Sequence, residues 1–307
     1  EALTASPADR DRMRQQLAAT LDVTTVVMRV GGLVLTTPEV GPGAVKNPQV
    51  EGAVLVGTPS SFGFATADAV ATIDGISDTV VAAGATAATL AADKQTAAIL
   101  APDGVSVVRA GDASARLVDG RPGLIAPALD PFRFVWSVPA SSAAAIVAFE
   151  VDGTDHVVQS GLPADATVVS IDVSRDGTRL LVYASTSVGN KLFVGGIIRQ
   201  QGSNVPTALG ELLELPVPAG RPIDATWVDD RTVATVSRGA ENSPVTLAEI
   251  GGPSSNVGSV SEARSIAGGN NFSEGLRVLR PDGEIWRTQG AGWVATGLVA
   301  SFIGTKQ

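Results

Sequence analysis

The stretch Val168–Ser185, VVSIDVSRDGTRLLVYAS, predicts two β-strands joined by a tight turn. In its first half, apolar and polar residues alternate as far as Val173, which is the period of two expected for a half-buried strand. Asp176 and Gly177 supply the turn, because Asp bonds its own backbone and Gly tolerates a positive φ. The continuous apolar run Leu180–Tyr183 is typical of a strand covered on both faces. The stretch therefore predicts the inner hairpin of a repeated β unit.

The composition agrees with many short strands. The 307 residues are 44% hydrophobic but only 4% aromatic, and they include 34 glycines and 18 prolines. Such a chain suits strands of Val, Ala, Leu and Ile separated by turns. The net charge is −9 and the basic residues are scattered, which argues against a nucleic acid or an anionic membrane surface as partner.

Two absences from the sequence restrict its chemistry. There is no cysteine and a single histidine, His156, which excludes disulfides, cysteine-based zinc sites, Fe–S clusters and thiol nucleophiles. No stretch of 18 apolar residues is present, so no membrane-spanning helix is predicted. The chain begins at Glu1 rather than Met, and we expect any signal or lipid anchor to precede it. We predict neither a metal nor a cofactor.

A helix is predicted near the start of the chain. Ser6 is a suitable N-cap and Pro7 a suitable first helical residue. Met13, Leu17 and Leu21 then lie at i, i+4 and i+8, which places one apolar stripe along a helix that runs to about Leu21.

The β-branched run Thr24–Val30 predicts a strand that ends at Gly31-Gly32. One helix and one strand bury too little surface to be stable alone. We therefore interpret residues 1–36 as the end of a second, truncated domain. Residues 37–59, rich in Pro and Gly, predict a connector, and residues 60–307 predict the main domain.

The main domain repeats the opening pattern. Asp-Gly pairs, a strong hairpin signal, occur at 74–75, 103–104, 119–120, 152–153, 176–177 and 282–283. Five units have a strand, a turn and a second strand, and their first halves are 90–95, 124–131, 169–177, 224–231 and 265–274. A sixth half-unit, 298–304, stops before its second strand.

The spacing of the units identifies the architecture. The turn acids Asp93, Asp130, Asp176 and Asp229 are 37, 46 and 53 residues apart, and Glu274 follows 45 residues later. A period near 40–50 residues built of short strands predicts a β-propeller.

The two ends of the main domain predict how the ring closes. Strands expected at Phe62–Thr66, Ala69–Ile73 and Thr79–Ala82 have no inner strand of their own, and Leu298–Gly304 can supply it. Closure by strands from both termini removes open edges. We predict six blades, with five or seven as alternatives, in an all-β domain preceded by a short helix–strand segment.

Four segments resemble one protein family. They are MRQQLAATLDVTTVVMRVGG (13–32), LDPFRFVWSV (129–138), VSRDGTRLLV (173–182) and PDGEIW (281–286) with GW (292–293). Together they resemble the LpqB family of actinobacterial lipoproteins, in which a GerMN-type domain precedes a C-terminal β-propeller. Residues 3–35 match the last helix and strand of the GerMN part, and about 60–307 match the propeller.

The resemblance implies a function for the chain. It implies an extracytoplasmic lipoprotein held at the cell membrane by an N-terminal lipidated Cys, which this sequence lacks. It also implies an accessory role with the MtrA–MtrB two-component system, through contact with the extracellular sensor domain of the histidine kinase MtrB. The family supplies no catalytic motif to transfer.

Residues suited to catalysis have simpler interpretations. His156 adjoins Asp155, but it has no second His or Cys with which to hold a metal, and we expect it at an exposed hairpin end. No G-x-S-x-G nucleophile elbow and no phosphate-binding loop is present. Asp172, Asp176, Asp229 and Asp230 raise the possibility of paired carboxylates, yet they fall in repeat-equivalent positions and we interpret all four as turn residues.

The tryptophans predict packing. Trp136, Trp227 and Trp286 lie in strands of different blades and Trp293 follows a turn. We expect each to pack between blades with its indole N–H bonded to backbone. The alternative is that one or two border an interface, where Trp is enriched.

Two polar segments are the candidate partner-binding loops. Gly195–Gly210 is longer than a hairpin requires, and so is Gly251–Ser259. Long polar loops at blade ends are where propellers acquire partner contacts. The residues that we single out for partner binding are Arg199, Gln200, Gln201, Asn204 and Asn256.

Three functions remain open from the sequence. The first is a non-catalytic binding module that docks a membrane-bound sensor kinase. The alternative is a propeller hydrolase or lactonase, which requires carboxylates or a metal converging at the central channel. The third is a purely structural role in the cell envelope.

Overall fold

The computed structural model describes residues 6–21, 23, 25–37, 54–66, 69–268, 275–290 and 292–306. The chain forms two compact units, Glu1–Pro48 and Gln49–Gln307.

The first unit contains the predicted helix, α1 (Pro7–Leu21). The Ser6 hydroxyl accepts the backbone N–H of Asp9 at 3.1 Å and donates to its carboxylate at 2.7 Å, which satisfies donors that the first helical turn leaves free. A two-residue hairpin follows, β1 (Arg29–Val30) and β2 (Leu33–Val34).

The strand predicted at Thr24–Val30 is therefore shorter than expected. Only Arg29 and Val30 are in β1, and residues 25–28 are not in a strand. The turn at Gly31 and Gly32, with φ values of 57° and 83°, reverses the chain so that pairing extends over two residue pairs. A β-branched run becomes a strand only as far as a neighbour is there to pair with it.

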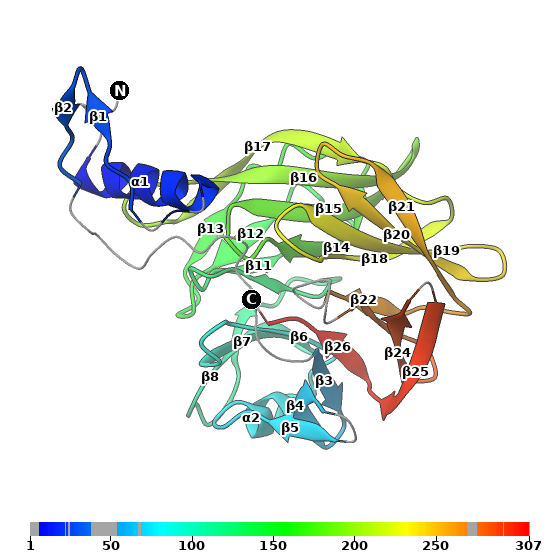
Figure 1. Cartoon of the computed structure of the whole chain (residues 1–307). Helices are drawn as coiled ribbons and strands as arrows, with labels where there is room; N and C mark the ends of the chain where they lie inside the picture. The colour runs from blue at the N-terminus through cyan, green and yellow to red at the C-terminus, as the bar shows by residue number, and fades with distance from the viewer. Residues whose placement is uncertain are drawn as a thin grey trace. The chain divides into compact units, whose positions relative to one another are not determined.

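The second unit is a β-propeller with six blades of four antiparallel strands each, counted over the described residues (Figure 1). From innermost to outermost, blade 1 is β26 (Phe302–Gly304), β3 (Leu55–Thr58), β4 (Ser61–Ala65) and β5 (Val70–Thr72); blade 2 is β6 (Ala87–Leu90), β7 (Thr96–Ala101), β8 (Gly104–Arg109) and β9 (Arg116–Asp119); blade 3 is β10 (Ala128–Leu129), β11 (Val135–Ser137), β12 (Val147–Phe149) and β13 (Asp155–Val157).

Three further blades complete the ring. Blade 4 is β14 (Thr167–Val173), β15 (Arg179–Thr186), β16 (Gly189–Arg199) and β17 (Pro206–Leu215); blade 5 is β18 (Arg221–Trp227), β19 (Thr232–Arg238), β20 (Ser243–Glu249) and β21 (Ser254–Val260); blade 6 is β22 (Ser265–Ala267), β23 (Arg277–Leu279), β24 (Glu284–Gln289) and β25 (Gly292–Val299). The opening stretch forms β14 and β15, as predicted.

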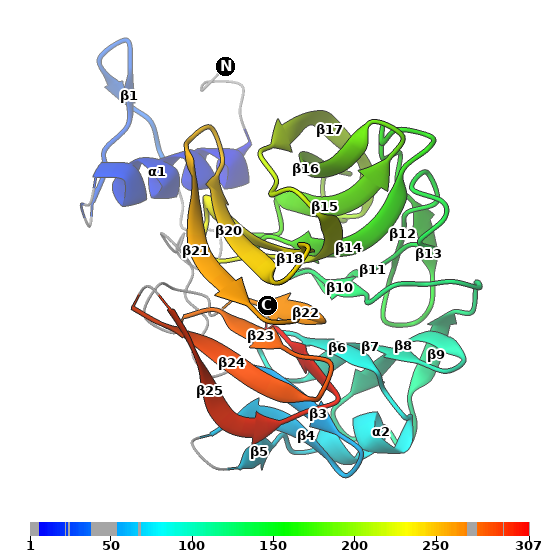
Figure 2. The ribbon, with the colours of Figure 1, turned by 90° about the vertical axis from the view of Figure 1, so that its right-hand side faces the viewer.

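The six innermost strands surround the axis of the propeller. Each of β6, β10, β14, β18, β22 and β26 contacts the next, and β26 contacts β6 to close the ring (Figure 2). Because strands alternate in direction, all innermost strands begin on one face. We call it the start face; it also carries the loops between second and third strands and those between blades. The opposite surface, the end face, carries the other turns.

The ring is closed by the C-terminal strand, as predicted. In β26, Phe302 pairs with Gly57, Ile303 with Val56, and Gly304 with Leu55. The partner strand β3 was not expected, because it lies inside residues 37–59, the predicted connector. Leu55 and Val56 are buried, and this apolar pair holds the start of the propeller against its end.

The strand predicted at Thr79–Ala82 is wrong. These residues belong to the helix α2 (Ser77–Ala82), which follows β5 and packs on β4. The Ser77 hydroxyl accepts the N–H of Ile73 at 2.7 Å and donates to the carbonyl of Phe62 at 2.6 Å. The β-branched pair Val80-Val81 by itself prefers a strand. The burial of Val80 and these hydrogen bonds stabilise the helix instead.

The Asp-Gly pairs fulfil two different roles. The pairs at 103–104, 152–153, 176–177 and 282–283 turn hairpins, as predicted. The pairs at 74–75 and 119–120 do not: the first precedes α2, and the second leaves blade 2. Asp and Gly adopt the turn in both settings, so the dipeptide indicates a turn without indicating what it joins.

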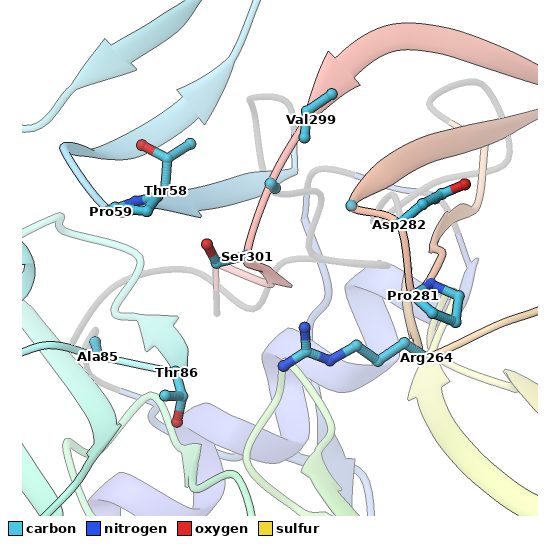
Figure 3. Close-up of a pocket in the computed structure, with 11 residues that line it drawn as sticks. Thr58, Pro59, Ala85, Thr86, Arg264, Pro281, Asp282, Val299 and Ser301 are labelled. Atoms are coloured by element: carbon cyan, nitrogen blue, oxygen red, sulfur yellow. The ribbon is translucent and has the colours of Figure 1, made fainter.

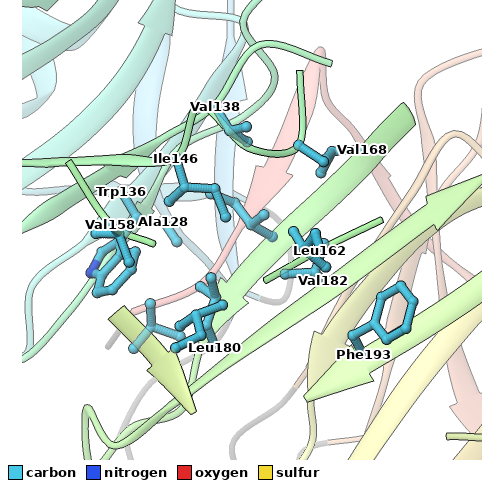
Figure 4. Packing of buried hydrophobic residues seen from close by; sticks show 14 of the residues in the cluster. Ala128, Trp136, Val138, Ile146, Val158, Leu162, Val168, Leu180, Val182 and Phe193 are labelled. Carbon is cyan, nitrogen blue, oxygen red and sulfur yellow. The ribbon is translucent and has the colours of Figure 1, made fainter. Parts of the chain in front are cut away.

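The hydrophobic core lies between the blades. Between blades 3 and 4, Trp136 and Ile146 pack with Val168, Leu180 and Val182, all buried (Figure 4). Similar clusters lie between the other neighbouring blades.

Closure of the ring is tested by Phe302→Ala. Phe302 is 6% exposed and its ring lies 6.0 Å from that of Phe62. Truncation should lower the free energy of unfolding by about 3–5 kcal/mol, as measured by urea titration. Val299→Ala, at a nearby side chain that is 62% exposed, should cost less than about 0.5 kcal/mol. Equal losses in the two variants would contradict the structure at β26.

Candidate functional site

Side-chain oxygens near the axis hold the innermost strands of neighbouring blades together. From β14, the Ser170 hydroxyl accepts the N–H of Ala225 in β18 at 3.0 Å. The Asp172 carboxylate accepts the N–H of Trp227 at 3.1 Å and the hydroxyl of Thr226 at 3.0 Å. These donors lie on the edge of β18 that has no strand beside it in its own sheet.

The same arrangement recurs one blade further on. From β18, the Asp224 carboxylate accepts the N–H of Ile266 in β22 at 2.9 Å, and the Thr226 hydroxyl accepts the N–H of Gly268 at 3.2 Å. Ser170 and Asp224 each follow a register shift in their strand. Asp172 is therefore a strand residue, and its interpretation as a turn residue is wrong.

Burial gives these carboxylates unusual electrostatics. Desolvation raises the pKa of Asp224 to about 7, against the opposing effect of its backbone hydrogen bonds. Desolvation also raises the pKa of Asp172, while the Trp227 N–H and the positive charge of Arg175 act against this rise. Burial lowers the pKa of Arg175 to about 10, and the charge of Asp172 partly offsets this effect.

The end of the chain lies across the axis on the end face. The Arg175 guanidinium donates to the Lys306 carbonyl at 2.5 Å, and the Leu90 N–H donates to the Thr305 carbonyl at 3.0 Å. Lys306 also forms a parallel bridge with Leu90. Thr305 and Lys306 accordingly lie beside the innermost strand β6 and the turn between β14 and β15. Residues from blades 2 and 4 thus hold the chain end at the end-face mouth.

The other predicted turn acids do form turns. Asp93, Asp130, Asp176 and Asp229 each accept the backbone N–H of the residue two positions later, as expected of Asx turns. Glu274 lies outside the described residues. Asp230 lies in the same turn as Asp229, 3.8 Å from the Arg231 guanidinium.

His156 has a structural neighbourhood in β13. Its Nε2 lies 2.9 Å from a Glu150 carboxylate oxygen, and its ring packs edge-on against Phe134 with centroids 5.9 Å apart. The side chain is half-buried rather than fully exposed as expected, and its carboxylate neighbour is Glu150 rather than Asp155.

The tryptophans pack within and between blades. Trp136 and Trp227 are fully buried, and Trp286 and Trp293 partly. Trp227 and Trp293 donate their indole N–H to the backbone carbonyls of Asp172 and Val257, as predicted. Trp136 and Trp286 donate instead to the carboxylates of Asp130 and Glu284.

The predicted loop Gly195–Gly210 is mostly strand. β16 and β17 extend through it, and only residues 200–205 remain between them. Arg199 ends β16 with a side chain that is 11% exposed, and its guanidinium donates to the carboxylate of Asp130, which is fully buried, at 2.7 Å. It also lies over the Phe132 ring at 4.5 Å. Arg199 thus ties blade 4 to blade 3.

The other predicted partner-binding residues are exposed. Gln200, Gln201 and Asn204 lie in the short turn on the end face, where Asn204 has a φ of 58°. The second predicted loop, Gly251–Ser259, is largely β21, so Asn256 lies in an outermost strand, where its side chain accepts the Gly258 N–H. Both segments are paired because outer strands extend each blade. Their role in partner binding stays a prediction.

Several hollows of the propeller lie on the start face, opposite the predicted loops. One of about 360 Å³ is lined by the hydroxyl-bearing Thr58, Thr86 and Ser301 together with Arg264 and Asp282 (Figure 3). These residues come from blades 1, 2 and 6. Sequence reasoning missed them because no local pattern joins positions so far apart.

Two further observations concern the described residues. They contain no group of three or more His, Cys, Asp or Glu side chains arranged to hold a metal ion. Among them, too, no helix has the length and apolar character needed to cross a membrane.

Comparison with known proteins identifies the family. The profile described as the lipoprotein LpqB β-propeller domain matches residues 61–301. The chain belongs to the LpqB β-propeller family. The family resemblance stated from the sequence is thus confirmed over the propeller. No curated protein matches the chain.

Solved structures match this LpqB-family chain at low identity. *Kuenenia stuttgartiensis* hydrazine synthase matches with 15% identity and a TM-score of 0.46, over 69% of this chain and 66% of that chain, just under two thirds of its length. A putative TolB from *Agrobacterium tumefaciens* matches with 13% identity and a TM-score of 0.45, over 71% of this chain and 85% of that one.

The raised pKa of Asp224 predicts a pH-dependent stability. An unfolded aspartate titrates near pH 4, so between about pH 4 and 7 the folded protein binds more protons than the unfolded chain. The free energy of unfolding should therefore decrease as the pH rises from about 4 to 7, by roughly 1 kcal/mol per pH unit, and should then level off. Asp224→Asn, which cannot ionise, should flatten the slope of unfolding free energy against pH. The control Asp103→Asn, at an exposed turn, should retain the wild-type slope. If Asp224→Asn also retains the wild-type slope, the pH dependence does not come from Asp224.

The Arg199–Asp130 pair predicts a structural cost. Arg199→Met leaves the Asp130 carboxylate buried without its cation and should lower the unfolding free energy by about 3 kcal/mol. Arg231→Met, at an exposed turn residue on the end face, should change it by less than about 0.5 kcal/mol. Chemical denaturation measures both, and a negligible loss in Arg199→Met would show that the pair does not stabilise the fold.

Proposed function

We propose that this LpqB-family propeller is a non-catalytic, extracytoplasmic accessory module that regulates a sensor kinase by protein–protein contact. Membership of the LpqB family over residues 61–301 is the observation that carries the proposal. The family association names an MtrB-like histidine kinase as the partner, through its extracellular sensor domain. A lipid anchor ahead of residue 1 belongs to the same proposal.

The chemistry of the axis supports binding over catalysis. A propeller hydrolase would need carboxylates free to reach a substrate or a metal. Asp172 and Asp224 instead accept backbone N–H groups of the next blade, and moving either side chain toward a substrate would break these hydrogen bonds between blades. The Arg175–Lys306 contact lies at the end-face mouth of the same axis.

The faces of the propeller are better suited to recognition. Loops and hollows on them combine polar groups with exposed backbone, and they can vary without disturbing the ring. The end face offers Gln200, Gln201 and Asn204, and the start face offers the hollow of Figure 3.

The proposal is tested by binding. The full-length lipoprotein and this 307-residue chain should each bind the purified sensor domain of the kinase with a dissociation constant in the micromolar range or tighter, as measured by biolayer interferometry. The sensor domain of an unrelated kinase is the control. Absence of binding by the full-length lipoprotein at micromolar concentrations would refute the proposal.

A further inference from the structure

Three arginines meet in one hollow on the start face. Arg221 begins β18, Arg238 ends β19, and Arg264 lies in the connection from blade 5 to blade 6. All three are exposed and line a hollow of about 390 Å³. The rest of the lining is apolar and includes Pro222 and Pro281, and it contains no acidic residue.

Two of the arginines stand directly opposite each other. Arg221 and Arg238 are cross-strand partners in the β18–β19 register. Side chains of directly opposed residues lie about 5 Å apart at Cβ, and like charges in this position destabilise a sheet. An anion placed between the two guanidiniums would remove that repulsion, and Arg is suited to bidentate bonds with carboxylate.

The three arginines also differ from several others in the described part of the chain. Arg109, Arg121, Arg133, Arg179, Arg199 and Arg280 each form an ion pair with a nearby carboxylate. Within the described residues, no ion pair or side-chain hydrogen bond is found for Arg221, Arg238 or Arg264. In a protein of net charge −9, three cations left together without acids form a local positive site.

The hollow continues along the start face. Arg264 and Pro281 line both this hollow and the neighbouring one with Thr58, Thr86 and Ser301. Figure 3 shows the Arg264 side chain extending from beside Pro281 toward the second hollow. The Asp282 carboxylate there is engaged by Arg280 at 3.1 Å. The two hollows adjoin at their two shared residues, Arg264 and Pro281. We call them together the groove; arginines line one part of it and hydroxyl groups the other.

We propose that this groove, defined by Arg221, Arg238, Arg264, Pro281, Thr86 and Ser301, binds an extended acidic segment of a partner protein. Carboxylates of the segment would pair with the arginines while its apolar groups lie against the prolines. A membrane fits less well, because an extended segment can follow a groove between blades, whereas a bilayer presents a flat surface. The inference specifies the docking face and rests on the proposed function for the identity of the partner.

The experiment compares two triple variants of the whole chain. Arg221→Ser/Arg238→Ser/Arg264→Ser removes the groove charges. Arg116→Ser/Arg231→Ser/Arg287→Ser removes the same number of charges from exposed arginines elsewhere. The groove variant should fold, with an unfolding temperature equal to or above that of the wild type, because a like-charge pair is removed.

The first probe is a fluorescent peptide of ten residues with six glutamates, compared with its glutamine counterpart by anisotropy at about 50 mM salt, where charge pairs are weakly screened. The glutamate peptide should bind the wild-type chain and the control variant, and the groove variant should lose at least about tenfold in affinity. Equal weakening of both variants, binding of the glutamine peptide with the same affinity, or no binding to the wild type would overturn the proposal.

Two more probes separate the alternatives. Vesicles of phosphatidylglycerol and phosphatidylcholine should not bind; groove-dependent vesicle binding without peptide binding would assign the groove to lipid and overturn the proposal. The kinase sensor domain should lose affinity for the groove variant but not for the control. If the sensor domain binds both variants equally, the groove proposal fails and the proposed function stands. If the peptide binds through the groove and the sensor domain does not bind at all, the proposed function fails and the groove proposal stands.

Discussion

The innermost strand of every blade has one edge with no strand beside it, and the rest of the propeller depends on how that edge is satisfied. Unpaired backbone N–H groups in a buried ring are costly. Around β18 and β22 their partners are oxygens on the preceding innermost strand: Ser170, Asp172, Asp224 and Thr226. Blades 4 and 5 thus each supply acceptors for the next blade, so that neighbouring sheets with no shared strand are joined near the axis. These hydrogen bonds explain why the carboxylates of Asp172 and Asp224 lie near the axis, away from water. Their desolvation there raises their pKa values.

This use of the axis leaves recognition to the faces. On the end face, Arg175 donates a hydrogen bond to the carbonyl of Lys306, and Arg199 forms an ion pair with Asp130. Both contacts join segments from different blades. On the start face, by contrast, hollows form where one blade connects to the next. Arg221, Arg238 and Arg264 are exposed on this face, and for that reason we propose it as the docking surface.

Local patterns were enough to predict much of the propeller. The turn acids Asp93, Asp130, Asp176 and Asp229 bond to the backbone two residues on, and this interaction needs no tertiary context. Their spacing therefore reveals the blades. Predictions failed where strand pairing or packing decides the structure. Thr79–Ala82 is helical because blade 1 contacts Ser77 and Val80. The predicted loop at 195–210 is mostly strand because β17 pairs with β16. Arg199 lies in this segment and was therefore predicted as an exposed loop residue, although it forms an ion pair within the protein.

By itself, the sequence determined the repeat and the six blades, because both depend on periodicity and turn chemistry within about 50 residues. Closure by the C-terminal strand followed from the incomplete last unit, although its partner strand β3 was not predicted. It also carried the family resemblance. Only the tertiary structure decided which residues meet. Arg221, Arg238 and Arg264 belong to no motif, and two of them oppose each other solely through the β18–β19 register. Asp172 and Asp224 resemble possible catalytic acids until the neighbouring blade shows which N–H groups they bind. A propeller brings distant segments together at blade junctions, and contacts across those junctions leave no local trace in the sequence.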